Sequence, residues 1–202
     1  MDRKRDLRVI KTRRAIEGAF VDLLLEKGFA NITVQDIADR ALINRKTFYG
    51  HYQDKYELAG HLVEKALQIA SDPVLGATVT SREEAEACCE QLYANRRLIL
   101  AVWDIHEGEG LDFTAALKSD LEEKYLAMAE ERDTPGDHGF QAALFSAFVT
   151  ETLRHVLEAE DVDAARQNPF FATGELANLQ RTLESLNTWD DGQNKRTQTR
   201  HD

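Results

Sequence analysis

The fold is decided by residues 28–58, which read GFANITVQDIADRALINRKTFYGHYQDKYEL. Gly28 suits the end of a preceding helix, because glycine tolerates the positive φ that a helix C-terminus often requires. Thr33 and Asn44 are of the residue types that cap helix N-termini, and Asp36 stands in the capping-box position after Thr33. The stretch therefore predicts two short helices separated by a few residues, the spacing of a helix-turn-helix.

The rest of the chain also predicts helices. One is expected from about residue 5 to 27 and a linking helix from 54 to about 71. Longer ones are expected at 81–106, 112–131, 137–160 and 173–189. Apolar residues recur at helical intervals, as in Leu58, Leu62, Ala66 and Ile69, and no β-branched alternation bounded by hairpin turns is present. We predict an all-α protein, with an N-terminal three-helix helix-turn-helix domain joined by the linking helix to a larger helical domain.

Charge divides the chain into two parts. The net charge is −11, but residues 1–55 hold 12 Lys and Arg against 8 Asp and Glu, a net of +4. The remaining 147 residues hold 13 against 28, a net of −15. We call residues 1–55 the head and the remaining residues the body. A basic head on an acidic body indicates that the head binds a polyanion.

Several protein classes find no support in the sequence. No apolar run approaches the ~18 residues of a membrane helix, and no secretory signal is recognisable, so we expect a cytoplasmic protein without a membrane partner. Cys88 and Cys89 are adjacent, which offers no disulfide framework and no spaced metal-ligand set. No catalytic or phosphate-loop signature is present. We therefore expect no enzyme activity, no cofactor and no metal site.

Three elements of the quoted stretch occur together in a known family. They are Gly28-Phe29, the Thr-Val-x-x-Ile-Ala run from Thr33 to Ala38, and the Phe-Tyr-x-His-Tyr-x-x-Lys run from Phe48 to Lys55. In this order and spacing they resemble the DNA-binding domain of the tetracycline-repressor (TetR) family. The resemblance implies a helix-turn-helix domain at 1–55, with a basic arm at 1–6. It further implies a helical effector-binding and dimerisation domain at 56–188, and we read 189–202 as a disordered tail.

The turn between the two short helices departs from the family pattern. The family usually has Ala-Gly-Val there, and this chain has Ala41-Leu42-Ile43. A leucine adopts a positive φ only at a cost of ~1 kcal/mol or more. Either Leu42 bears that strain, or the turn is wound differently and presents the following helix at another angle.

The expected DNA contacts lie in and around the second short helix. Arg45 or Lys46 can donate to guanine O6 and N7, and Thr47 can meet a thymine methyl group. Thr33 can meet a phosphate at a helix N-terminus. The resemblance adds contacts to DNA from Tyr49, His51 and Lys55. The alternatives are that Tyr49 is a core aromatic residue and that His51 only caps a helix.

The body suggests an effector pocket and a dimer interface. The candidate pocket residues are Tyr93, Trp103, His106, Phe113 and Phe145, any of which could instead be ordinary core. The interface residues proposed on the last two helices are Leu144, Phe148, Leu176, Leu179, Leu183 and Leu186. The leucines repeat at intervals of three and four, a narrow seam suited to helix packing, although a core within one chain would explain either helix alone.

These patterns lead to one main hypothesis and one alternative. The main hypothesis is a ligand-responsive transcription regulator, most often a repressor in this family. It would bind a palindromic double-stranded DNA operator as a homodimer and answer to an unknown small-molecule effector. The alternative is a regulator-like protein that acts through a protein partner, as a co-activator does, with weak or no operator binding.

Overall fold

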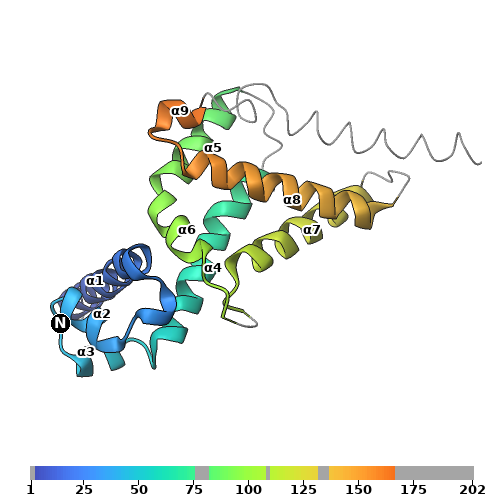
Figure 1. Cartoon of the computed structure of the whole chain (residues 1–202). Helices are drawn as coiled ribbons and strands as arrows, with labels where there is room; N and C mark the ends of the chain where they lie inside the picture. Colours follow the sequence, from blue (N-terminus) through green and yellow to red (C-terminus); the bar gives the residue numbers. More distant parts are fainter. Residues whose placement is uncertain (1–2, 76–81, 108–109, 132–136, 167–202) are drawn as a thin grey trace, which may run out of the picture. The chain divides into compact units, whose positions relative to one another are not determined.

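The computed structural model describes residues 3–75, 82–107, 110–131 and 137–166 (Figure 1). Within these ranges the regular structure is helical and includes no strand. The elements are α1 (Arg3–Lys27), the 3-10 helix η1 (Phe29–Asn31), α2 (Val34–Arg40), α3 (Arg45–Tyr49), α4 (Lys55–Leu75), α5 (Arg82–Ala94), α6 (Arg96–Trp103), α7 (Phe113–Glu131), α8 (His138–Leu157) and α9 (Val162–Arg166). No helix of the described ranges is long and apolar enough to cross a membrane.

The all-α prediction is confirmed, although details differ. The helix expected at 81–106 is in fact two, because Asn95 leaves helical geometry at φ −103° and ψ 7° between α5 and α6. Asparagine favours such positions because its side chain competes with the helical backbone for hydrogen bonds. The short helix α9 was not predicted. The helix expected at 173–189 and the tail at 189–202 lie outside the described residues.

The chain divides into two compact units. The first contains the described residues of Met1–Ala70 and Ala94–Ala116, and the second those of Ser71–Tyr93 and Leu117–Asp202. The helices α4 and α7 therefore contribute residues to both units. The division groups α6 with the N-terminal helices. It does not test the expected domain boundary at residue 55, which stays a prediction.

The first unit is built around aromatic side chains from α1, η1 and α3. Phe20 and Phe48 are fully buried, and the Phe20 and Phe29 rings meet edge to face with centroids 6.2 Å apart. Buried residues on α1 recur at helical spacing: Ile16, Ala19, Phe20, Leu23 and Leu24. One apolar face of α1 thus covers the helix-turn-helix, which is why these short helices need no long hydrophobic faces of their own.

Both predicted caps are present. The Thr33 side chain accepts from the Asp36 backbone N–H while the Asp36 carboxylate accepts from the Thr33 backbone N–H, a complete capping box. The Asn44 side chain accepts from the Thr47 backbone N–H at 2.7 Å and so begins α3. The caps fix where α2 and α3 begin.

The turn between α2 and α3 keeps a left-handed residue despite its sequence. Leu42 has φ 55°, the one positive value found at a non-glycine residue in the described ranges. Its side chain is 92% exposed, so no burial offsets the strain. Of the two alternatives for this turn, the strained leucine is the one observed.

The second unit is held by α7 packing on α8 and α5 packing on α9. The rings of Tyr125 and Phe145 lie 5.2 Å apart, and the Ser146 hydroxyl donates to Glu122 at 2.8 Å. Arg166 on α9 pairs with Glu90 on α5. Buried Cys88 and Cys89 lie on α5, and burial raises the pKa of the Cys88 thiol to about 11, which keeps it protonated and unreactive near neutral pH.

We predict that Leu42→Gly stabilises the protein. Glycine removes the left-handed strain of a leucine, partly offset by the greater entropy of the unfolded chain, so the free energy of unfolding should rise by about 0.5–1 kcal/mol. Urea unfolding followed by circular dichroism measures this. The control Leu25→Gly, an exposed leucine inside α1, should lower it by about 1 kcal/mol. A destabilised Leu42→Gly variant would contradict the account.

Candidate nucleic-acid interface

The short helix α3 presents its first turn outward. Phe48 anchors it in the core, and Asn44 accepts hydrogen bonds from both the backbone N–H and the hydroxyl of Thr47, at 2.7 and 3.0 Å. Arg45 and Lys46 are exposed beside them. The Thr47 hydroxyl is thus already used in the cap, which leaves its methyl group as the part able to meet a base.

Arg45 and Tyr49 form a pair on the surface of α3. The Arg45 guanidinium donates to the Tyr49 hydroxyl at 3.0 Å and lies 5.7 Å from the ring centre. Tyr49 is 48% exposed, so it is not a core aromatic residue. The contact orders the guanidinium while most of its five N–H groups remain able to reach an acceptor.

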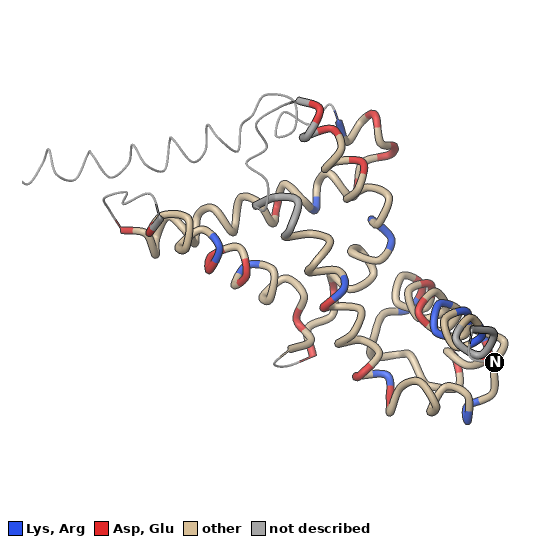
Figure 2. The backbone as a smooth tube through the Cα atoms, turned by 180° about the vertical axis from the view of Figure 1, so that it is seen from behind, with Lys and Arg blue, Asp and Glu red and all other residues tan. Residues whose placement is uncertain are grey.

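Lys46 and His51 are the other polar side chains near α3. Neither side chain makes a hydrogen bond or an ion pair with any residue that the structure describes. The His51 side chain therefore caps no described helix, although its backbone N–H donates to Phe48 at 2.8 Å. Basic positions recur along α1 and at the start of α3, whereas acidic positions recur along α5 and α7 (Figure 2).

Thr33 is already committed to its cap. Its hydroxyl donates to the Asp36 carboxylate at 2.6 Å, and Lys27 pairs with the same oxygen at 3.0 Å. The Thr33 and Lys27 contacts lower the pKa of Asp36 from 3.8 to about 2. The carboxylate therefore stays charged and occupies the N-terminus of α2, where a phosphate would otherwise be favoured. Its contribution to stability is fully present above pH 4 and is lost as the pH falls towards 2.

Lys55 ties η1 to the start of α4. Its ammonium donates to the carbonyl oxygens of Phe29 and Ile32, each at 3.0 Å, and lies 4.4 Å from the centre of the Phe29 ring. An ammonium has three N–H groups, so one remains for a phosphate. The sequence pattern picked out this lysine but did not reveal the internal bonds.

The five candidate effector residues are divided between the two units. Trp103 and Phe113 are buried together in the first unit, with ring centroids 5.4 Å apart. His106 pairs with Asp112 at 3.0 Å in the same unit. In the second unit, Phe145 packs on Tyr125, and the Tyr93 hydroxyl donates to the carbonyl oxygens of Ala159 and Glu160. Each residue has a local structural role.

The candidate interface residues that the structure describes lie on an apolar face of α8. Leu144 is 38% and Phe148 is 42% exposed. Phe140, one turn earlier and 59% exposed, extends the same face and was missed in the sequence, although its spacing of four residues from Leu144 pointed to it. The other four proposed interface residues, Leu176, Leu179, Leu183 and Leu186, lie outside the described residues.

A capped, outward-facing short helix after a tight turn, covered by one long helix, defines a helix-turn-helix DNA-binding unit. Residues 18–62 match the family described as bacterial regulatory proteins, tetR family. The helix-turn-helix segment of this chain is therefore similar to the DNA-binding region of that family of transcription regulators.

Individual proteins are similar to parts of this chain or to its fold. The uncharacterized HTH-type transcriptional regulator YxbF of Bacillus subtilis is 42% identical over 76 residues, which are 34% of this chain and only 20% of that protein. A TetR transcriptional regulator from Streptococcus agalactiae is similar in structure, with a TM-score of 0.56, 27% identity, and coverage of 86% of this chain and 98% of that one. AibR, solved with isovaleryl coenzyme A and operator DNA, has a TM-score of 0.50 at 17% identity, with coverage of 75% and 89%.

We predict that Lys55→Gln lowers the free energy of unfolding by about 1–2 kcal/mol, because two carbonyl oxygens lose a charged donor. Urea unfolding measures the change. The matched control is Lys46→Gln, whose side chain has no described partner and whose stability should stay within about 0.5 kcal/mol of wild type. Equal stabilities for the two variants would show that the Lys55 tie contributes nothing.

Proposed function

We propose that the protein is a ligand-responsive transcription regulator of the cytoplasm, acting as a repressor that binds a palindromic operator as a homodimer. The observation that carries this proposal is the first turn of α3, where Asn44 caps the helix, Phe48 anchors it, and Arg45 and Lys46 face outward. A short basic helix held in this way can enter a major groove.

The contacts to DNA divide into two kinds. Arg45 and Lys46 would donate to guanine edges, and the Thr47 methyl group would meet thymine. Tyr49, His51 and the third N–H of Lys55 would bind phosphates and set the register of the helix. Thr33 is the weakest member, because its hydroxyl and backbone N–H are both bonded to Asp36.

The face of α8 supports the homodimer. Phe140, Leu144 and Phe148 form an apolar row with a period of four residues, and a second copy related by two-fold symmetry could cover it, together with Leu176, Leu179, Leu183 and Leu186. Two α3 helices held about 34–36 Å apart would meet successive major grooves of one duplex, which requires a palindromic operator.

The effector would bind in the helical body and change that spacing through α4. Tyr93, Trp103, His106, Phe113 and Phe145 remain the candidate residues. AibR is a protein of this fold that was solved with both an acyl coenzyme A and operator DNA, which supports an effector as well as an operator for the fold. Differential binding of roughly 1–3 kcal/mol between two states would lower operator affinity 5–150-fold.

A second function would be action through a protein partner, with weak operator binding. It is favoured by the internal bonds of Thr33 and Lys55, which reduce the groups available to phosphates, and by the acidic body. The DNA-binding experiment below separates the two functions.

We expect the purified protein to enrich palindromic duplexes from a random library, with an affinity that falls steeply with salt. Arg45→Ala should relax the preference at one defined base position in each half-site, by about 1–3 kcal/mol. Fluorescence anisotropy with single-base variants of the enriched duplex measures this. The control Lys118→Gln, an exposed cation on α7, should bind as wild type does. Absence of any enriched sequence would favour the partner-dependent function.

We expect Leu144→Glu to give a monomer. A carboxylate placed in an apolar interface loses its hydration without gaining a partner, which costs several kcal/mol unless the subunits separate. Sedimentation velocity measures the mass, and circular dichroism checks that the variant stays helical. Leu25→Glu, at an exposed leucine on α1, is the control and should leave the mass unchanged. A Leu144→Glu variant that remains a dimer would move the interface away from α8.

A further inference from the structure

One carboxylate lies where α1, the end of the helix-turn-helix and α4 meet. Glu17 is on α1, and its side chain is only 13% exposed. One oxygen accepts a hydrogen bond from the Tyr52 hydroxyl at 3.3 Å and lies 3.2 Å from Arg13 Nε and 3.3 Å from His61 Nε2, while the other accepts from Lys65 at 3.0 Å. Such a set of donors to one acid is a fixed junction rather than a loose surface ion pair.

The charge of this carboxylate is stable near neutral pH. Burial by itself raises the pKa of Glu17, but the contacts with Lys65, His61 and Tyr52 outweigh it, so the pKa lies below its usual value. The acid therefore remains ionised, and its neighbours remain bound to it, under the conditions in which a regulator works.

The donors come from two segments that matter for DNA binding. Tyr52 follows α3 by three residues, is buried, and packs on Phe48, the anchor of α3, with ring centroids 6.0 Å apart. His61 and Lys65 lie one turn apart on α4. Arg13 also donates to the Tyr52 hydroxyl at 3.1 Å, which closes the junction on the α1 side.

The junction adds a second charged side-chain contact between α4 and the N-terminal helices of the first unit. The first is Lys55, bonded to η1 at the start of the helix. Ten residues separate Lys55 from Lys65, about 15 Å along a helix that rises 1.5 Å per residue. A contact at one point would fix only the position of α4. Contacts at both Lys55 and Lys65 also fix the direction of α4 relative to α1 and α3.

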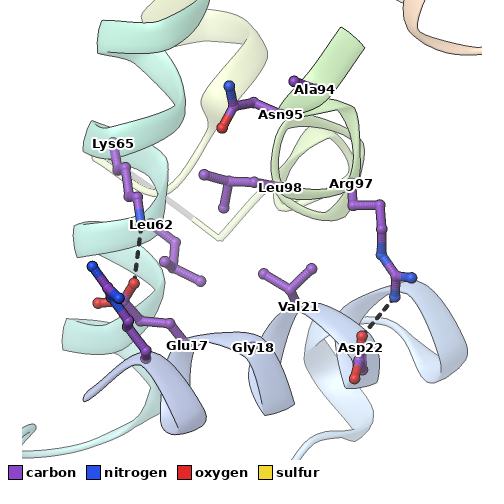
Figure 3. A pocket seen from close by; sticks show the side chains of 11 residues that line it. Glu17, Gly18, Val21, Asp22, Leu62, Lys65, Ala94, Asn95, Arg97 and Leu98 are labelled. Carbon is purple, nitrogen blue, oxygen red and sulfur yellow. Dashed lines mark hydrogen bonds and ion pairs between the residues drawn. The ribbon is translucent and has the colours of Figure 1, made fainter. Parts of the chain in front are cut away.

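The buried residues Leu58 and Leu62 pack α4 into the first unit, and a groove lies beside them. A groove of about 480 Å³ opens between α1, α4 and α6, with Val21, Leu62 and Leu98 at its centre (Figure 3). The Glu17–Lys65 pair lies at one side of it and the Asp22–Arg97 pair, at 2.6 Å, at the other.

We propose that Glu17 is a positioning residue for DNA binding. Its contact with Tyr52 holds the end of α3, and its contacts with His61 and Lys65 hold the direction of α4. Glu17 thereby sets the angle between α3 and α4. This role rests on the proposed DNA-binding function, and Glu17 itself touches no DNA.

The test is Glu17→Gln, assayed by anisotropy on the duplex enriched by the wild-type protein. We expect binding about tenfold weaker at 25 °C, within the range of such couplings, in a variant that circular dichroism shows to be folded. The sign of the change is decisive. Removal of a negative charge from a protein that binds a polyanion strengthens binding if only charge matters, whereas loss of positioning weakens it.

The control is Glu26→Gln on the same helix, which breaks the exposed Glu26–Arg40 pair and should leave binding unchanged or slightly tighter. If Glu17→Gln unfolds at 25 °C, Tyr52→Phe removes one hydroxyl from the junction and should weaken binding in the same direction by a smaller factor. Wild-type or tighter binding by the folded Glu17→Gln variant, or by Tyr52→Phe where Glu17→Gln does not fold, overturns the positioning role. Failure of wild type and Glu26→Gln to bind any enriched duplex overturns the proposed function instead.

Discussion

The structure depends on the burial of Phe48 in a helix that cannot exist alone. The helix α3 has five residues, fewer than an isolated helix needs for stability in water. Two contacts replace that missing stability: the Phe48 ring in the core under α1, and the Asn44 cap that satisfies the backbone of the first turn. Because these two contacts stabilise α3, its exposed first turn does not need apolar residues. Arg45 and Lys46 can therefore occupy that turn without removing side chains from the core.

The basic head has fewer available cations than its composition indicates. Lys27 pairs with Asp36, Arg40 with Glu26, and Lys55 donates to backbone carbonyl oxygens. The Lys27 and Lys55 contacts fix the start of α2 and the start of α4, whereas the Arg40–Glu26 pair is an exposed surface contact between α2 and α1. These three of the twelve cations in residues 1–55 therefore have structural contacts, whereas Arg45 and Lys46 on α3 face outward. Affinity should then depend more on the placement of a few cations than on net charge.

In the body, the residues proposed for an effector site already make structural contacts. Trp103 and Phe113 fill a core, Tyr93 holds the end of α8, and the pair of His106 and Asp112 closes the loop before α7. Aromatic residues in a helical body are expected to pack, and an effector site built among them would have to use their exposed edges or a rearranged state. The apolar row on α8 differs, because its side chains are exposed along successive turns.

Capping chemistry and apolar spacing act over a few neighbouring residues. The helical class, the order of the short helices, both caps and the residues of α3 could therefore be predicted from the sequence. It also located the unusual turn at Leu42, although only the structure showed that leucine accepts a positive φ there. Contacts across 23 to 48 residues of chain were beyond it: Lys55 on η1, and Tyr52, His61 and Lys65 around Glu17. A local pattern cannot tell whether a charged side chain faces solvent or an internal partner, since that depends on which helices the tertiary fold brings together.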